Sequence, residues 1–163
     1  INAKKTPLKM RYMKYLLLLL FAIGLSTGYG QKMSNSRSVK DKAAIEKQQQ
    51  ETLFKSLVRD MMDAYNEGRY LQVAQYYHDD AIVSGGTTFV EGRDALDQYW
   101  EDFFSIGGKW QLTINWERHY TDYVVQRGKS VIIQRNGEKS EVEFFLHWRK
   151  VNGEWKISQD IYW

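Results

Sequence analysis

The spacing of hydrophobic residues predicts a long helix in the first half of the chain. Between residues 45 and 65, apolar side chains recur every three or four positions, as on a helix with one buried face. The predicted buried face consists of Ile45, Leu53, Phe54, Leu57, Val58, Met61 and Tyr65. We expect this helix to begin between residues 39 and 50 and to end in a left-handed cap at Gly68.

Two further helices are predicted on either side of a short hairpin. One covers residues 70–77, and the other is the segment GRDALDQYWEDFF, residues 92–104. The buried stripe of the latter consists of Leu96, Tyr99, Trp100 and Phe103. Between the two helices, AIVS and TTFVEG are β-prone segments joined by a glycine turn at Gly85 and Gly86.

The segment YYHDDAIVSGG places a histidine beside two aspartates just where the second helix should end. His78, Asp79 and Asp80 could be metal ligands or simply the polar end of a helix. Adjacent side chains on a helix end diverge, and no second cluster of ligand-type residues lies at metal-binding spacing. We therefore expect a polar helix terminus and no metal.

Alternating hydrophobic and polar positions predict strands from residue 109 to the end of the chain. The predicted strands are WQLTINWERH, YVVQRGKSVIIQ, KSEVEFFLHWRK and WKISQDIYW. Asn–Gly turns in RNGE and VNGE join the last three, which is typical of an antiparallel meander. Gly128 is the expected site of a β-bulge.

Charge and composition narrow the possible partners. The 163 residues carry a net charge of +3, but residues 1–30 hold five basic residues and no acid. The remainder is therefore slightly acidic, with no basic patch that would indicate nucleic-acid binding. The absence of cysteine excludes disulfides and a thiol nucleophile.

The first 30 residues have the pattern of a secretory signal peptide. A start at Met10 or Met13 is followed by basic residues, an apolar run at residues 16–25 and small residues before Gln31. Because the apolar run is short for a membrane span, we expect cleavage near Gly30, no stable membrane insertion, and a periplasmic or secreted protein. The predicted organisation is a leader at 1–30, a flexible segment at 31–42 and a single domain at 43–163.

Three motifs in order resemble the nuclear transport factor 2-like superfamily, and within it the SnoaL-like, ketosteroid-isomerase-like proteins of unassigned function. They are DAYNEGRYLQVAQYYHDDAIVSGG, VEGRDALDQYW and NGEWKISQDIYW. The resemblance implies an α+β fold in which a cone-shaped, curved antiparallel sheet wraps around three helices from the N-terminal half. It also implies a pocket at the mouth of the cone and, often, a homodimer formed through the sheet.

The resemblance further implies positions for the catalytic groups of a ketosteroid isomerase. In this chain those positions hold Gly85 in place of the general base, and Met61 and a residue near Phe145 in place of the oxyanion donors. Proton abstraction next to a carbonyl needs both a base and a donor. The isomerase set is therefore absent.

Other polar residues could face the cone. The resemblance places Glu141, Glu143, Phe145 and His147 toward the interior, although a shift of one residue would exchange the two sheet faces. Candidate catalytic groups are His147, Glu143 and Asp160, and candidate pocket walls are Tyr65, Trp100, Trp116, Phe145 and Tyr162. On the last strand, we expect Asp160 and Tyr162 on one face and Trp155, Ile157 and Ile161 on the other.

Three functional hypotheses follow. The first is an exported domain that binds a small hydrophobic or ring-containing ligand in an aromatic pocket, with no cofactor. The second is a lyase, isomerase or hydrolase that uses a histidine–carboxylate pair in the cone. The third is a dimerisation or interaction module that uses an aromatic sheet face.

Overall fold

The computed structural model describes the backbone of residues 9–163 and the side chains of residues 38–163. The chain divides into two units, Ile1–Gln49 and Gln50–Trp163. The predicted leader and its cleavage site near Gly30 lie outside the residues whose side chains are described. In the described part of the chain, no helix has the length and apolarity needed to cross a bilayer.

Helix α1 (Lys9–Asn66) begins much earlier than the hydrophobic pattern predicts. Residues 31–42, where we expected irregular chain, are helical, because no glycine or proline interrupts residues 31–66. Val39 and Ile45 are exposed by 67% and 55% respectively, so Ile45 does not belong to the buried face. The buried face begins at Phe54, and the predicted glycine cap at Gly68 is confirmed by its φ of 82°.

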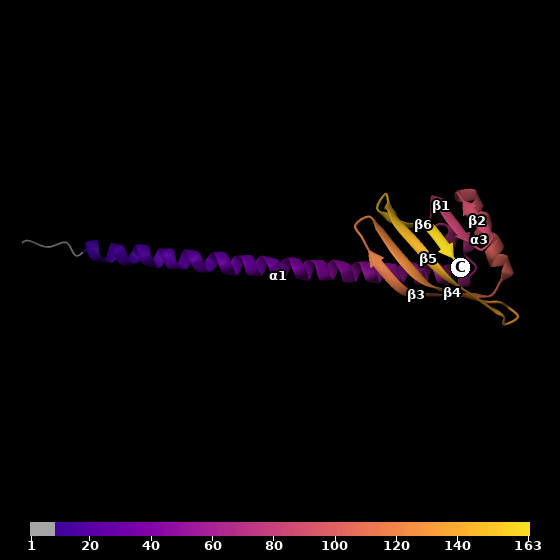
Figure 1. Ribbon diagram of the computed structural model, residues 1–163, viewed down its shortest axis with the longest axis horizontal. Helices are drawn as coiled ribbons and strands as arrows, with labels where there is room; N and C mark the ends of the chain where they lie inside the picture. The colour runs from indigo at the N-terminus through magenta and orange to yellow at the C-terminus, as the bar shows by residue number, and fades with distance from the viewer. Residues whose placement is uncertain (1–8) are drawn as a thin grey trace, which may run out of the picture. The chain divides into compact units, whose positions relative to one another are not determined.

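The unit Gln50–Trp163 is an α+β domain, as predicted. After α1 it contains α2 (Tyr70–Ala74), β1 (Tyr77–Gly85), β2 (Thr88–Glu91), α3 (Arg93–Ile106), β3 (Lys109–His119), β4 (Tyr123–Ile133), β5 (Lys139–Val151) and β6 (Glu154–Tyr162). The strands form one six-stranded sheet in the order β2-β1-β6-β5-β4-β3. Strands β3 to β6 are the predicted antiparallel meander, and β1 joins β6 in parallel (Figure 1).

Strand β1 starts earlier, and α2 ends earlier, than the sequence indicates. Tyr77, His78 and Asp79 belong to β1, so the predicted helix end at these residues is wrong. Arg93, the first residue of α3, anchors the start of β1. Its guanidinium donates hydrogen bonds of 2.9 Å to the carbonyl oxygens of both Ala74 and Tyr77.

Two one-residue irregularities determine which side chains face the helices. In β3, Ile114 pairs with Gly128 and Trp116 with Arg127, which leaves Asn115 as an extra residue. In β6, Trp148 pairs with Ile157 and His147 with Gln159, which leaves Ser158 as an extra residue. Side-chain alternation reverses at each bulge. The predicted bulge is therefore next to Gly128 but on the facing strand.

The core lies between the inner sheet face and the buried sides of α1 and α3. Its largest members are aromatic: Phe54, Tyr65, Trp100 and Trp148 are each at most 2% exposed. Phe54 packs edge-on against Trp148, with ring centroids 5.5 Å apart, and Tyr65 packs against Trp110 at 5.4 Å. These contacts attach α1 to the strands.

Gly128 provides a test of this packing. A Cβ atom at this position would lie 2.2 Å from the Thr113 carbonyl oxygen and 2.7 Å from the Phe144 ring. We expect Gly128→Ala to lower the free energy of unfolding by about 2–3 kcal/mol in chemical denaturation, because the backbone of β3 must move. Gly86→Asn is the control, since Gly86 has open space around it and a φ of 55° that Asn tolerates. Equal stability of Gly128→Ala and the wild type would contradict the packing described.

Candidate functional site

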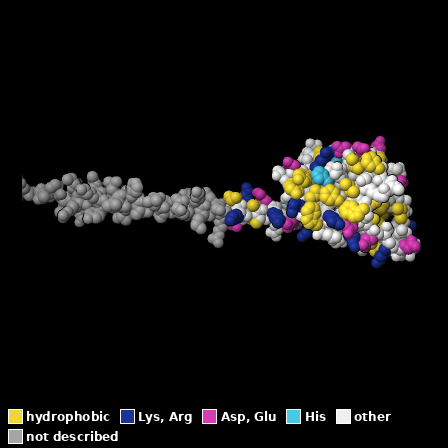
Figure 2. Space-filling view, viewed as in Figure 1, with side chains coloured by type: hydrophobic (Ala, Val, Ile, Leu, Met, Phe, Trp, Pro, Cys, Tyr) yellow, Lys and Arg dark blue, Asp and Glu magenta, His cyan; other side chains and the backbone are white. Residues whose placement is uncertain are grey.

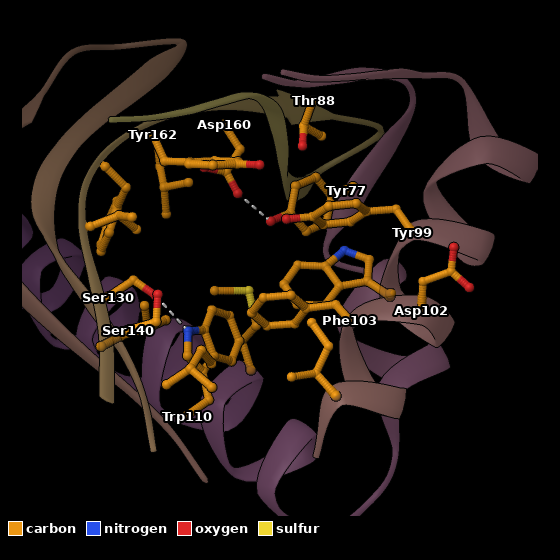
Figure 3. A pocket seen from close by; sticks show the side chains of 18 residues that line it. Tyr77, Thr88, Tyr99, Asp102, Phe103, Trp110, Ser130, Ser140, Asp160 and Tyr162 are labelled. Atoms are coloured by element: carbon orange, nitrogen blue, oxygen red, sulfur yellow. Dashed lines mark hydrogen bonds between the residues drawn. The ribbon is translucent and has the colours of Figure 1, made fainter. Parts of the chain in front are cut away.

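A cavity of about 570 Å³ lies between the inner sheet face and helices α1 and α3 (Figure 3). Its wall is mostly apolar and aromatic. It consists of Met61, Tyr77, Thr88, Tyr99, Trp100, Asp102, Phe103, Ile106, Trp110, Leu112, Ser130, Ile132, Ser140, Val142, Phe144, Leu146, Asp160 and Tyr162. A concave site of this size and lining is typical of small-molecule pockets.

The polar end of the cavity is built around Asp160. The Tyr77 hydroxyl donates a hydrogen bond of 2.6 Å to Asp160 Oδ2. Removal from water raises the pKa of Asp160 to about 6, although the hydrogen bond from Tyr77 acts in the opposite direction. Asp160 is therefore a carboxyl group that titrates near neutral pH inside an apolar cavity.

Tyrosines surround this carboxylate. Figure 3 shows the side chains of Tyr77 and Tyr99 beside Asp160, with Trp110 and Ser130 across the cavity. Burial raises the pKa of Tyr77 well above its usual value, and the negative charge of Asp160 adds to that effect. Burial, followed by the charge of Asp160 and the nearby Tyr162, likewise raises the pKa of Tyr99. These tyrosines are neutral hydrogen-bonding groups at any physiological pH.

The opposite wall is held in place by hydrogen bonds to Trp110. Its indole Nε1 donates a 2.8 Å hydrogen bond to Ser130 Oγ. The Asn66 side chain accepts from the Trp110 backbone N–H at 2.8 Å and donates to its carbonyl oxygen at 2.9 Å. Trp100 packs against Trp110, with ring centroids 5.3 Å apart. The end of α1 thus positions the first inward residue of β3.

Two of the predicted pocket walls line the cavity, and three do not. Trp100 and Tyr162 line it, whereas Tyr65 is buried behind the wall, against Phe103 and Trp110. Trp116 and Phe145 lie on the outer sheet face, so these two predictions are wrong. Both pair with Arg127, in a row that runs across the sheet. The bulge at Asn115 turns Trp116 outward.

The structure separates the three candidate catalytic groups. Asp160 lines the cavity, but Glu143 and His147 are on the outer face of β5, whose inner face carries Val142, Phe144 and Leu146. The predicted register of β5 is therefore wrong by one residue. Other groups on the outer face already bind both side chains. Glu143 accepts a 2.5 Å hydrogen bond from Arg127, and His147 Nδ1 is 2.6 Å from Ser158 Oγ.

The polar residues of YYHDD make polar contacts with the elements on either side of β1. Arg149 Nη2 is 2.6 Å from Asp80 Oδ1 and 2.7 Å from His78 Nδ1. The hydrogen bond from Arg149 lowers the pKa of Asp80. Asp79 is 3.4 Å from Arg93. These contacts tie β1 to β5 and α3, and none of the three polar residues reaches the cavity.

A polar chain inside the sheet was not expected from the sequence. The Trp148 indole donates a 2.8 Å hydrogen bond to the fully buried Gln126, whose amide in turn donates to Glu117. Glu117 also contacts His119 Nε2. The four residues come from three different strands, β3, β4 and β5, so only the pairing of these strands brings them together. We assign the chain a structural role, because it lies apart from the cavity.

A curved sheet closed by helices around one cavity defines the class of NTF2-like folds. Solved structures of that class are similar to this chain. An NTF-2 like protein of unknown function from Shewanella oneidensis is 18% identical, with 67% of this chain and 94% of that chain covered and a TM-score of 0.60. An NTF2-like protein of unknown function from Pseudomonas putida is 14% identical, with 68% and 83% covered and a TM-score of 0.59. A protein of unknown function from Mycobacterium tuberculosis is 17% identical, with 73% and 74% covered and a TM-score of 0.60.

Residues 58–157 match the SnoaL-like domain, and the chain belongs to that family. The resemblance drawn from the three motifs is thus confirmed. No curated protein matches the chain. At these identities the solved structures establish the fold alone, and the function has to be argued from the cavity.

The raised pKa of Asp160 predicts a pH-dependent stability. The pKa of this carboxyl group is 3.8 ordinarily and about 6 in the folded protein. Between these pH values the folded protein therefore keeps a proton that the unfolded chain has lost. The stability that this group contributes therefore falls as pH rises from about 4 through 6 and levels off near pH 7. We therefore expect the difference in free energy of unfolding between Asp160→Asn and the wild type to shift in favour of the variant by on the order of 2 kcal/mol between pH 4 and pH 7. Chemical denaturation at each pH measures it.

Tyr77→Phe is the matched control for this measurement. It removes the hydrogen bond that lowers the pKa of Asp160. The pH range over which the stability falls should therefore move upward. A stability difference between Asp160→Asn and the wild type that is the same at every pH would contradict the buried position of Asp160.

Proposed function

We propose that this protein binds a small molecule with an apolar ring system inside the cavity. The observation that carries the proposal is the cavity itself, which side chains do not fill although aromatic groups line it. The half-buried carboxyl group of Asp160 offers an oriented polar contact at one end. An apolar wall with a few polar groups is the usual composition of a ligand site.

Aromatic rings account for the preference for a ring-containing ligand. Tyr99 and Phe103 are stacked at a centroid distance of 6.0 Å, and Trp100 meets Phe103 edge-on at 5.4 Å. Rigid rings bury a large area on a flat ligand at little cost in side-chain entropy. We further propose that the protein works outside the cytoplasm, which rests only on the leader pattern of residues 1–30.

An enzymatic role remains a second candidate, and Asp160 is the group that favours it. A carboxyl group with a pKa near 6 suits general acid–base chemistry at neutral pH. The histidine–carboxylate version of this hypothesis is not supported, because His147 lies on the opposite face of the sheet. Any acid–base reaction here would pair Asp160 with Tyr77 or Tyr99.

The outer sheet face favours a role in self-association. Trp116, Phe145 and Ile161 lie in one row across the sheet, interrupted by Arg127. Trp163 is 57% exposed beside this row, over Arg127. Figure 2 shows hydrophobic side chains gathered over the sheet and interspersed with charges of both signs. Such a face suits a two-fold interface between copies of this chain.

Light scattering tests this self-association. At tens of micromolar, the protein should have the mass of a dimer, and Phe145→Glu should have the mass of a monomer, since it places a charge in the middle of the row. Ala95→Glu, at an exposed position of α3 on the other side of the sheet, should leave the dimer intact. A wild-type protein that is monomeric at this concentration would contradict the proposal.

Ligand binding is tested by blocking the cavity. Val142 lines it, and the adjacent Glu141 points to the outer face beside Lys129. We expect Val142→Phe to reduce the affinity for naphthalene-sized ring compounds at least tenfold, because the new ring occupies their space, whereas Glu141→Phe keeps the wild-type affinity. Quenching of tryptophan fluorescence and thermal shift measure both. If no ring compound binds the wild type at millimolar concentration, the proposal fails.

A further inference from the structure

The Asp160 carboxylate has no positive partner. Tyr77, which is uncharged, is the one side chain in the described part of the chain whose hydrogen bond to it is resolved. Among residues 38–163, no Lys, Arg or His lines the cavity, whereas Asp160 and, at the exposed end of α3, Asp102 do. On the outer face of the sheet, Arg127 and Lys129 pair with Glu143 and Glu141.

This arrangement is costly for a protein that only needs a well-packed interior. A carboxylate withdrawn from water without a counter-charge destabilises the fold, and the raised pKa of Asp160 reports that cost. Asparagine has the same shape and could accept the hydrogen bond from Tyr77 without a charge. The negative charge therefore requires a separate explanation.

The rings beside Asp160 line the same cavity as the carboxylate. Tyr77 and Trp100 are 5.7 Å apart between centroids, Tyr99 and Trp100 are 5.3 Å apart, and all three line the cavity with Asp160. Aromatic faces attract cations, and tyrosine and tryptophan do so most strongly in sites from which water is excluded. A carboxylate and several rings together favour a cation over a neutral group.

We propose that the ligand carries a positively charged nitrogen, an ammonium or a quaternary ammonium, attached to its apolar ring body. The nitrogen lies between Asp160 and the rings of Tyr77, Tyr99 and Trp100, and the ring body lies toward Trp110 and Phe103. This inference rests on the proposed function, because it names the class of ligand for the same cavity. The same charge distribution excludes carboxylates and phosphates from the cavity.

Binding of such a cation depends on pH through Asp160. The titratable groups that face Asp160 are Tyr77 from β1, Tyr99 from α3 and Tyr162 from β6, and the lining residues of β4 and β5 are not titratable. Asp102 of α3 is exposed at the edge of the cavity. Because burial raises the pKa of Tyr77 and of Tyr99, these two stay neutral, and affinity for the cation should fall as pH drops through about 6, where Asp160 takes up a proton.

Three probes of one shape test the proposal: 2-naphthylmethylammonium, 2-naphthylmethanol and 2-naphthylacetate. Isothermal titration at pH 7.5 and pH 5 gives the affinity of each, and the amine stays protonated at both pH values. We expect the ammonium to bind about tenfold more tightly than the alcohol at pH 7.5, and the carboxylate to bind more weakly than either. At pH 5 the ratio of ammonium to alcohol affinity should approach one.

Variants assign the effect to one carboxylate. Asp160→Asn should bring the ratio of ammonium to alcohol affinity close to one at pH 7.5. Glu141→Gln, which removes one negative charge from the outer face, should keep this ratio near ten. If Asp160→Asn does not fold, the change in the wild-type ratio between the two pH values carries the same information.

The outcomes separate the two levels of the proposal. If the alcohol binds as tightly as the ammonium, or the carboxylate binds more tightly, the cation proposal is overturned and ligand binding in the cavity stands. If the ratio is ten at both pH values, Asp160 is not the partner and the proposal is likewise overturned. If none of the probes binds at millimolar concentration, both the cation proposal and the proposed function fail.

Discussion

One extra residue in β6 determines what the cavity presents to a ligand. With Ser158 unpaired, Ile157 and Asp160 both face the interior, the former in the core beside Trp148 and the latter in the cavity. Strict alternation would turn Gln159 and Ile161 inward and expose Asp160 to solvent. Because the carboxylate is inside, its pKa rises, its charge is unmatched and the Tyr77 hydroxyl has an acceptor. The bulge at Asn115 likewise reverses the alternation in β3 and turns Trp116 to the outer face.

The position of Tyr77 shows how distant parts of the chain combine to build the site. Tyr77 begins β1, which pairs in parallel with β6, and its hydroxyl therefore reaches Asp160. Arg93 holds the start of β1 from the first turn of α3, and Asn66 at the end of α1 holds Trp110 on the far wall. The side chains that line the cavity are thus positioned by hydrogen bonds from residues that do not line it.

The two faces of β5 differ in chemistry and in what they contact. Val142, Phe144 and Leu146 form an apolar wall, whereas Glu141, Glu143 and His147 make polar contacts with β4 and β6 on the outside. The proposed ligand and the proposed second subunit would therefore contact opposite faces of the sheet. This separation is why a substitution on one face tests one role without disturbing the other.

The sequence by itself determined the elements and the family: the helical stripe at 54–65, the cap at Gly68, the meander with its Asn–Gly turns and the order of the three motifs. Local periodicity and turn chemistry specify these features, because they depend on neighbours in the chain. Only the tertiary structure decided which strand faces look inward, since a single bulge reverses them and leaves no clear sequence signal. It therefore moved Trp116, Phe145, Glu143 and His147 out of the predicted site and kept Asp160 in it. The absence of a counter-charge for Asp160 also emerged only there, because it depends on every strand and helix around the cavity.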